Sequence, residues 1–376
     1  MLAKRLLNAR EVLAYSREEV CKEAGIAVSR LESIELSLQK PTGDEVLILA
    51  SFYDCDFRGF LDDSVPPPIQ QADILFRRFG DSFTAKDRRV IQEFLHLCEI
   101  EAELEKILNE PKQSFSFTPS GSFYKSHGQQ AAEALRNQLR YADNVTPRDV
   151  YSDFRTIGIH IFRRKLSNPD ISGLYVEHPL AGHCVLVNYD EDIYRQRFSV
   201  AHEVAHSIFD STEKIMVSFQ PKSANYSKND LYEIRANSFA SAYLMPPAML
   251  HRLPRIDQTS ASYWAQQFRV STAALAKALK DSNLIDNDLA RAIRSVRVQS
   301  NEKIDPEAPH TLSSSQRERR LAFLERGLSD HYVGLCFEAH YRDQISTGRL
   351  VEALRIDPSE LSEVAALYGR TLSHDN

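Results

Sequence analysis

The chain has 376 residues, which is long for a single domain and favours two or three compact units. Its residues are 43% hydrophobic and 26% charged, a composition typical of soluble globular proteins. No apolar run approaches the roughly 18 residues of a membrane-spanning helix, and the charged N-terminus lacks the apolar core of a secretory signal. We therefore expect no part of the chain to lie in a membrane.

The overall charge does not indicate nucleic-acid binding, because the formal net charge is −6. Five scattered cysteines, odd in number and without a C-x-x-C pair, indicate reduced thiols rather than a disulfide framework. Together these features predict a cytoplasmic protein.

Residues 1–62 are expected to form a domain of short helices. Ser16 followed by Glu19 has the spacing of a capping box, and Gly25 suits the left-handed turn that ends a helix. The motifs S-R-E-E-V-C-K-E-A-G-I, S-R-L-E-S-I-E and K-P resemble the XRE (Cro/repressor-like) helix-turn-helix family. The resemblance is incomplete, since E-L-S at 35–37 stands where that family has Glu-x-Gly.

The resemblance implies that the second helix of the pair enters the major groove of DNA. Its candidate DNA-binding residues are Ser29, Arg30 and Ser33, with Arg30 as the reader of a guanine. However, this domain carries 8 Lys+Arg against 11 Asp+Glu, and a net charge of −3 neutralises phosphates poorly. DNA binding therefore requires that its cations gather on one face: Lys4, Arg5, Arg17, Lys22 and Arg30. Docking on a protein partner is the alternative role.

Residues 63–125 are predicted to be a linker followed by a long amphipathic helix. The prolines of V-P-P-P-I-Q-Q indicate the linker, and apolar residues at helical spacing over 86–108, interrupted by Glu101, indicate the helix. We expect this helix to pack on a neighbouring domain. A two-stranded coil, and hence a homodimer, is the alternative.

Residues 126–297 are predicted to form an α+β domain that contains the functional site. A helix is followed by the β-rich segments G-I-H-I-F-R-R-K-L, I-S-G-L-Y-V-E-H and H-C-V-L-V-N-Y, and then by two further helices, the second stopped by Pro246 and Pro247. Residues 298–316 are expected to be a polar linker, and residues 317–376 a helical C-terminal region without a recognisable motif.

The stretch R-F-S-V-A-H-E-V-A-H predicts a metal site. On a helix, His202 and His206 lie one turn apart and can offer imidazole nitrogens to one ion. Glu203 lies about 100° further round the helix, where it can act as a general base on a water molecule. The alternative is an ordinary helix, but apolar residues on the same side as the histidines indicate burial, and buried imidazoles need partners.

Glu233 on the next helix is the candidate third ligand. Two histidines and one glutamate leave the fourth position of Zn²⁺ open, as in catalytic sites. Asn237, one turn beyond Glu233, is a candidate to hold a ligating imidazole from behind. Asp210, one turn beyond His206, is a second such candidate, with a solvated helix end as its alternative role.

At these residues the chain resembles the ImmA/IrrE family of metallopeptidases over roughly residues 128–280. The resemblance rests on R-F-S-V-A-H-E-V-A-H, E-x-x-A-N-x-F-A and L-M-P-P, and it departs from the family at Ala205, where glycine is usual, and at Asp210, where a further histidine is common. It implies a gluzincin-type zincin fold with a small β-sheet, Zn²⁺ bound by His202, His206 and Glu233, and Glu203 as the catalytic residue. Mn²⁺ is the alternative metal.

The resemblance also implies a function, because known members of the family cleave helix-turn-helix repressors. We therefore expect a zinc endopeptidase that regulates transcription by cutting a repressor or a similar partner. The alternative is an antitoxin or regulator of a toxin–antitoxin or mobile-element locus that uses the metal domain to bind a partner, such as a toxin encoded nearby. Four residues close in sequence are candidate donors to the oxyanion of amide hydrolysis: Tyr226, Tyr232, Arg235 and His251. Three other histidines are expected to be structural: His160, His178 and His183.

Overall fold

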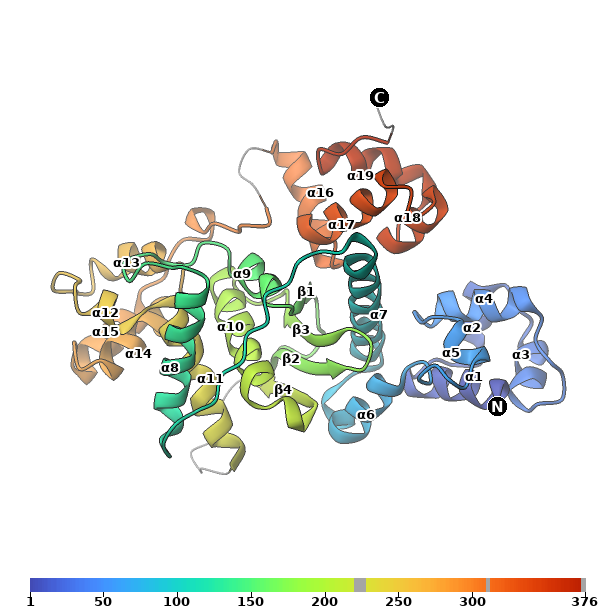
Figure 1. Ribbon diagram of the computed structural model, residues 1–376, viewed down its shortest axis with the longest axis horizontal. Helices are drawn as coiled ribbons and strands as arrows, with labels where there is room; N and C mark the ends of the chain where they lie inside the picture. The colour runs from blue at the N-terminus through green and yellow to red at the C-terminus, as the bar shows by residue number, and fades with distance from the viewer. Residues whose placement is uncertain (220–227, 309–311, 373–376) are drawn as a thin grey trace. The chain divides into compact units, whose positions relative to one another are not determined.

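The computed structural model describes residues 1–219, 228–308 and 312–372, and it divides into two compact units (Figure 1). The first unit comprises residues 1–100 with 165–169, and the second comprises residues 101–164 with 170–376. In the described part of the chain, no helix has both the length and the apolar character that crossing a bilayer requires. The protein is a mixed α+β structure in which the strands all belong to the second unit.

The first unit is helical. It contains α1 (Leu2–Val12), α2 (Arg17–Ala24), α3 (Val28–Glu35), α4 (Gly43–Phe52), α5 (Arg58–Leu61), α6 (Gln70–Phe79), the 3₁₀ turn Gly80–Ser82 and the beginning of α7 (Ala85–Leu108). The predicted capping box is present, with the Ser16 hydroxyl accepting from the Glu19 backbone N–H, and α2 ends at Gly25 with φ of 67°. Local side-chain chemistry thus sets both ends of α2.

An ion cluster lies in the core of the first unit. Glu35, at the end of α3, is buried and accepts two hydrogen bonds from Arg10 of α1 at 2.6 and 3.0 Å. Arg17 of α2 donates a third at 2.8 Å. One carboxylate therefore joins the first three helices, and its loss would leave buried charge without a partner.

The second unit is built on a four-stranded sheet with the order β1-β3-β2-β4. Its strands are β1 (His160–Arg164), β2 (Ile171–His178), β3 (Gly182–Asn188) and β4 (Ile215–Phe219). β1 runs parallel to β3, whereas β2 pairs antiparallel with both β3 and β4. The sheet thus ends at β4, a strand that the sequence pattern did not predict.

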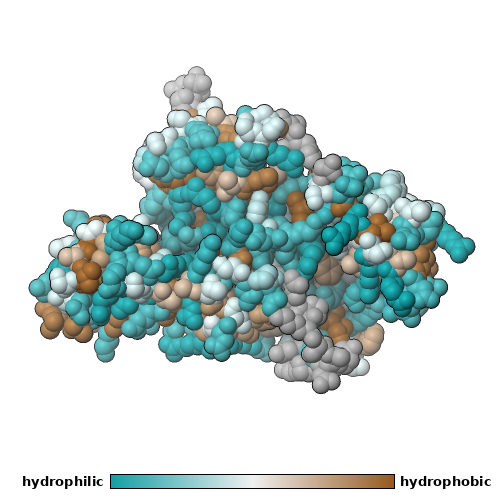
Figure 2. All heavy atoms as spheres, turned by 180° about the vertical axis from the view of Figure 1, so that it is seen from behind, coloured by the Kyte–Doolittle hydropathy of each residue, from teal (hydrophilic) through white to brown (hydrophobic). Residues whose placement is uncertain are grey.

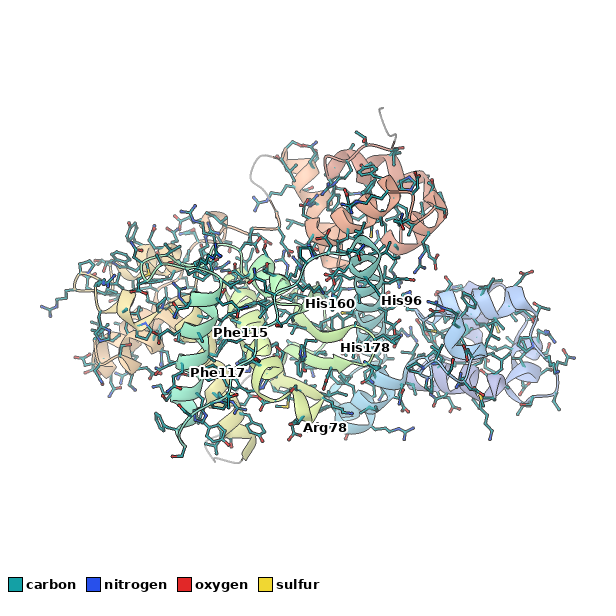
Figure 3. The ribbon with its side chains drawn as sticks, in the orientation of Figure 1. Arg78, His96, Phe115, Phe117, His160 and His178 are labelled. Carbon is teal, nitrogen blue, oxygen red and sulfur yellow. The ribbon has the colours of Figure 1, made fainter. Side chains whose placement is uncertain are left out.

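Two long helices beside the sheet carry the candidate metal ligands: α10 (Ile193–Phe209) and α11 (Lys228–Leu244). α10 packs on β2, β3 and α11, and α11 packs on α8 (Tyr124–Gln138). Gly128 allows the close contact of α8 with α11, because a Cβ there would lie 2.4 Å from the Arg235 carbonyl oxygen. The extended segment before α8 also touches α10, where Phe117 meets Phe209 edge to face at 6.0 Å between ring centroids (Figure 3).

The second unit contains further helices. α9 (Val150–Thr156) contacts β1 and α10, and α12 (Pro247–Leu250), α13 (Ala261–Phe268), α14 (Thr272–Asp281) and α15 (Asn287–Ser295) follow α11 in the chain. The C-terminal region contains α16 (Ser314–Glu325), α17 (Asp330–Tyr341), α18 (Thr347–Leu354) and α19 (Leu361–Leu367), with short 3₁₀ turns at Ser300–Glu302 and Pro358–Glu360.

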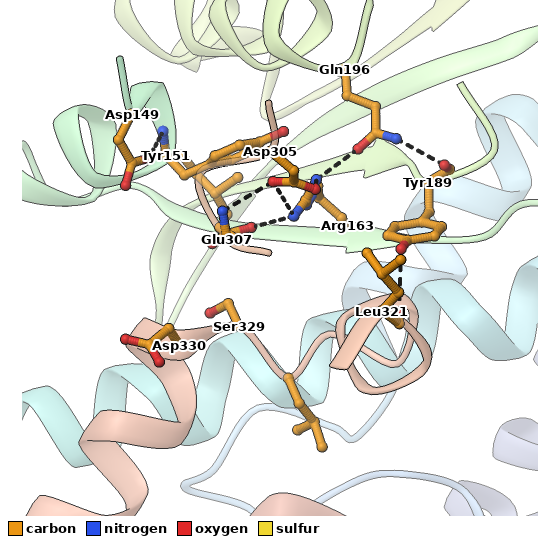
Figure 4. Close-up of polar contacts among 12 residues, drawn as sticks. Asp149, Tyr151, Arg163, Tyr189, Gln196, Asp305, Glu307, Leu321, Ser329 and Asp330 are labelled. Carbon is orange, nitrogen blue, oxygen red and sulfur yellow. Dashed lines mark hydrogen bonds and ion pairs between the residues drawn. The ribbon is translucent and has the colours of Figure 1, made fainter. Parts of the chain in front are cut away.

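The segment 298–308 differs from the solvated linker that was predicted for 298–316. Asp305 and Glu307 are buried, at 4% and 5% exposure, and they pair with two arginines of the sheet domain (Figure 4). Arg163 of β1 contacts Asp305 at 2.8 and 3.1 Å, and Arg155 of α9 contacts Glu307 at 2.7 Å. Polar composition indicated a linker, but these polar residues are charge partners of buried arginines. We call residues 303–308 the strap.

Candidate metal centre

The helix α10 brings two imidazoles together. It begins after Asp192, whose side chain accepts from the Tyr194 backbone N–H, and continues without a break to Phe209. His202 and His206 are 6% and 0% exposed, and their Nε2 atoms lie 3.2 Å apart. Because both nitrogens point to the same place, at most one N–H can lie between them, and the remaining lone pair is available to a cation.

Glu233 of α11 faces the same point. Its Oε2 lies 3.1 Å from His202 Nε2, and its Oε1 lies 3.4 Å from His206 Nε2. Ligand atoms around a tetrahedral Zn²⁺ with bonds of about 2.1 Å are separated by about 3.4 Å. The three side chains therefore have the spacing of zinc ligands, and they form one of the two groups with metal-binding geometry among the described residues.

Asp210 holds the His206 ring from behind. It is 3% exposed, so it is not a solvated helix end, and its Oδ2 accepts from His206 Nδ1 at 2.9 Å. This bond leaves Nε2 free for a metal, the usual arrangement around ligating histidines. Asp210 is itself held by Arg235 of α11, whose guanidinium lies over the Phe209 ring, 4.4 Å from its centroid. Asn237 makes no hydrogen bond to either histidine among the described residues. Of the two residues expected to support a ligating imidazole, Asp210 is therefore the one that contacts it.

The electrostatics of the site favour a bound cation. Burial alone would lower the pKa of His206, but the Asp210 and Glu233 carboxylates outweigh it and raise the pKa to about 10. Burial opposes ionisation of Glu233 as well, yet the two imidazoles hold its pKa well below the usual range. The carboxylates thus stabilise positive charge at the imidazoles, whether it comes from protons or from a metal ion.

Glu203 is adjacent to the ligands but differs from them. It is fully buried, and neither carboxylate oxygen has a hydrogen-bond partner among the described residues. Burial raises the pKa of Glu203 above its usual value, and the two imidazoles and the nearby Ser218 hydroxyl of β4 offset only part of this. A buried carboxylate without partners costs free energy unless a water or substrate group binds it. A water molecule or a substrate group bound to Glu203 would offset this cost.

Gly173 of β2 provides the space for that carboxylate. A Cβ at this position would lie 3.0 Å from Glu203 Oε1 and 2.8 Å from the Leu186 carbonyl oxygen of β3. Sequence reasoning missed this residue. The only local signal was a glycine inside a strand pattern, which often marks a close approach of another group.

The donors fit a divalent transition metal. Two neutral imidazole nitrogens and one carboxylate are typical of catalytic Zn²⁺, and Mn²⁺ accepts the same ligand types. Glu203 interacts electrostatically with both histidines and with Glu233, so it lies next to these donors. Together, the ligand spacing, the Asp210 bond and the Gly173 space indicate a metal centre rather than an ordinary helix with polar residues.

Three of the predicted oxyanion donors lie within the described residues, where their side chains contact groups other than Glu203 and the candidate ligands. Arg235 is paired with Asp210, and His251 is exposed with its Nδ1 2.7 Å from the Pro247 carbonyl oxygen. Tyr232 is half-buried: the Arg235 guanidinium lies over its ring, 5.1 Å from the centroid, and the Tyr124 ring of α8 lies 6.3 Å away. Tyr226 lies outside the described residues.

The predicted DNA-binding residues lie on α3, where Arg30 is already paired. Its guanidinium contacts both Glu45 oxygens at 2.8 Å and donates to the Lys40 carbonyl oxygen at 3.0 Å. Ser33 donates to the Ser29 carbonyl oxygen at 2.8 Å. Of the other cations expected on this face, Arg17 pairs with Glu35 and Arg5 with Asp63.

The three predicted structural histidines have different environments. His183 Nδ1 lies 2.8 Å from the Tyr175 hydroxyl, and His178 Nδ1 accepts from the backbone N–H of Ala181 at 3.2 Å. His160 Nδ1 lies 2.8 Å from Glu101 of α7, the residue that interrupts the apolar stripe of that helix. Glu101 is buried, so the interruption marks an ion pair and not a solvated position.

No curated protein matches the chain. Residues 154–280 match the model of the IrrE N-terminal-like domain family, Peptidase_M78. The matched region contains β1 to β4, α10 and α11, and therefore every residue of the metal centre described above, and this similarity supports the ImmA/IrrE resemblance for that part of the chain.

Proposed function

We propose that the protein is a metal-dependent endopeptidase with His202, His206 and Glu233 as the ligands of Zn²⁺ or, alternatively, Mn²⁺. One observation carries the proposal: two histidine Nε2 atoms lie 3.2 Å from each other and 3.1 and 3.4 Å from the two oxygens of one carboxylate, beside the buried Glu203, which has no hydrogen-bond partner among the described residues. The match to the IrrE N-terminal-like domain model supports a peptidase over other metal-dependent hydrolases.

Glu203 is the general base in this proposal. When bound, a divalent ion supplies a Lewis acid that polarises the scissile carbonyl. Glu203 takes a proton from the attacking water and passes it to the leaving amine, since it lies next to the ligands without being one. Asp210 keeps the His206 ring in the required tautomer through its bond to Nδ1.

The strand β4 is the proposed docking edge for substrate. It is the last strand of the sheet, and Ser218 within it lies near Glu203. An extended peptide can add to such an edge through backbone hydrogen bonds. A substrate strand on β4 would place its peptide bonds beside the metal centre.

The proposed substrate is a helix-turn-helix repressor or a similar partner protein, and we propose that residues 1–62 dock on it. The pairing of Arg5, Arg17 and Arg30 within the unit supports protein docking over DNA binding. So does a set of exposed apolar side chains on and between α3 and α4: Val28, Leu36, Leu38, Leu47 and Ile48. Figure 2 shows apolar side chains gathered among hydrophilic ones on this unit.

A regulator or antitoxin that binds its partner without cutting it is the second candidate function. The exposed apolar side chains of the first unit favour it as much as they favour a peptidase. The two functions differ at the metal centre, because binding alone does not require a free carboxylate at Glu203.

Metal content and cleavage test the proposal together. His202→Ala should lower the bound metal by one equivalent per chain in elemental analysis, whereas the exposed His251→Ala should not. Wild-type protein should cut the repressor encoded beside its gene into two fragments, and a chelator should stop the reaction. Unchanged metal in His202→Ala would remove the assignment, and a stable complex without fragments would favour the regulator.

A further inference from the structure

A second group of potential metal ligands lies away from the centre described above, where α7, β1 and α17 meet. Glu101 and Glu105 are one turn apart on α7, and they face His160 at the start of β1 (Figure 3). Each of these three offers a donor atom within 4.8 Å of the other two. His331 of α17 approaches from the other side, with Nε2 3.8 Å from Glu105 Oε1. We call these four residues the junction cluster.

The geometry resembles a ligated histidine with its supporting carboxylate. Glu101 Oε1 lies 2.8 Å from His160 Nδ1, which leaves Nε2 directed toward Glu105 Oε2 at 3.8 Å. A carboxylate bonded to the far nitrogen is the usual way in which proteins orient a metal-bound imidazole. Asp210 and His206 show the same relation at the first centre.

Two buried atoms of the junction cluster lack hydrogen-bond partners. Glu101 is 0% exposed, and its Oε2 has no such partner among the described residues; nor does His331 Nε2. The cluster therefore holds a buried carboxylate with one oxygen that has no hydrogen-bond partner in the described structure, an arrangement that a cation would stabilise.

In this structure Lys112 supplies a positive charge to the junction cluster. Its ammonium group contacts Glu105 Oε2, while the side chain is 31% exposed. A cavity of about 480 Å³ opens beside it, and its lining includes Glu105, Lys112 and His331. Lys112 can thus move into solvent, and the cavity has room for an ion that keeps some of its water.

We propose that the junction cluster is a second binding site for a divalent transition metal, with Glu105 and His160 as ligands, Glu101 orienting His160, and His331 close enough to Glu105 to join them. Imidazole and carboxylate together suit Zn²⁺ and Mn²⁺. Glu105 lies 3.8 Å from His160 and from His331, between the separations of adjacent ligands (about 3.1 Å) and opposite ligands (about 4.4 Å) of an octahedral ion, so the side chains would shift slightly to bind one. A bound ion would join α7, β1 and α17, and so tie the C-terminal helices to the sheet.

The test uses full-length protein from which the first centre has been removed. The double variant His202→Ala/His206→Ala should still bind about one Zn²⁺ per chain in isothermal titration calorimetry. Adding His160→Gln should abolish this binding, whereas adding His183→Gln, a half-buried histidine bonded to Tyr175, should not. A double variant that binds no Zn²⁺ would overturn the second site and leave the first untouched, so the two proposals fail separately.

Lys112→Met provides an independent check that does not depend on removing a ligand. If Lys112 occupies the place of the cation, its removal should tighten Zn²⁺ binding to the double variant by at least about tenfold, a change of about 1.4 kcal/mol. A purely structural ion pair predicts no such gain. Equal or weaker Zn²⁺ affinity in Lys112→Met would therefore contradict the proposal, even if His160→Gln failed to fold.

Discussion

Glu203, His202 and His206 lie on one helix, but their environments differ. The difference supports a role as general base for Glu203 and as metal ligands for the histidines. The histidines face Glu233, whereas both oxygens of Glu203 lie without hydrogen-bond partners in the described structure. We therefore predict that Glu203→Gln keeps the metal of the wild type and loses at least about 10²-fold in cleavage rate, the usual scale for a general base. Elemental analysis and a cleavage assay on the same sample measure both. Loss of metal would instead place Glu203 among the ligands.

The close contacts of Gly173 lead to a second prediction about a single residue. The Cβ of Gly173→Ala would lie 2.8 Å from a backbone oxygen of β3 and 3.0 Å from Glu203 Oε1, so the strand or the carboxylate must move. We expect a cleavage rate lowered by about tenfold or more, because small displacements of a catalytic group have large effects. Metal content should not change. Gly348→Ala, where the nearest atom is 3.8 Å away, is the control and should behave as wild type.

At this scale the sequence indicated which candidate ligands converge, but not which residues support them. The i, i+4 spacing of His202 and His206 follows from helix geometry alone. Gly173 escaped prediction because its role depends on the contact of β2 with α10, which is tertiary. The burial of Asp210 escaped for the same reason, since Arg235 comes from another helix.

At the scale of elements, the end of α3 shows the conformational strain of Ser37, which stands where the helix-turn-helix pattern has glycine. Leu38 N–H donates to the Ser33 carbonyl oxygen and Ser37 N–H to that of Ile34, the bonds of a Schellman motif. Ser37 takes the left-handed position with φ of 63°, where a residue with a Cβ is strained. We predict that Ser37→Gly stabilises the first unit by about 0.5–1 kcal/mol, measured by denaturant unfolding. A destabilised variant would show that the serine side chain has a role of its own.

Elements with strong local signals were predictable, and those that depend on distant partners were not. Capping residues indicated α2, and apolar periodicity indicated α7, close to their observed bounds. β4 was missed, because five residues after a helix carry little pattern and the strand exists through its pairing with β2. The polar composition of the strap suggested a linker, because the sequence does not show whether a charged residue is solvated or paired with a buried arginine.

At the scale of the whole molecule, the strap connects the sheet domain to the C-terminal helices within the second unit. Besides Asp305 and Glu307, it contains Lys303, which contacts Asp192 at the start of α10. Arg163 also contacts Gln196 of α10 at 3.1 Å. The strap thus contacts α10, the helix that carries His202 and His206. Detachment of the strap should therefore disturb both the metal centre and the packing of the C-terminal helices.

The acid sensitivity of the strap is the last prediction. Burial would raise the pKa of Glu307, but Arg155 and Arg163 outweigh it and lower the pKa below its usual value. A lowered pKa in the folded state means that the stabilisation is complete above about pH 4.3, the ordinary value for glutamate, and is lost as the pH falls further. Limited proteolysis within residues 298–308 should therefore be slow at neutral pH and rise steeply below about pH 4.

Glu307→Gln should reproduce the acid state at neutral pH. Breaking one side of a buried ion pair costs about 3–5 kcal/mol, so the variant should expose the strap to protease at pH 7 and lose most of the pH dependence. Glu302→Gln, whose carboxylate is exposed on the turn before the strap, is the matched control and should keep the wild-type profile. Equal protection of Glu307→Gln and wild type would mean that Asp305 alone holds the strap. Because the charge pairs are complete at neutral pH, we expect the C-terminal helices to stay attached to the sheet domain under those conditions.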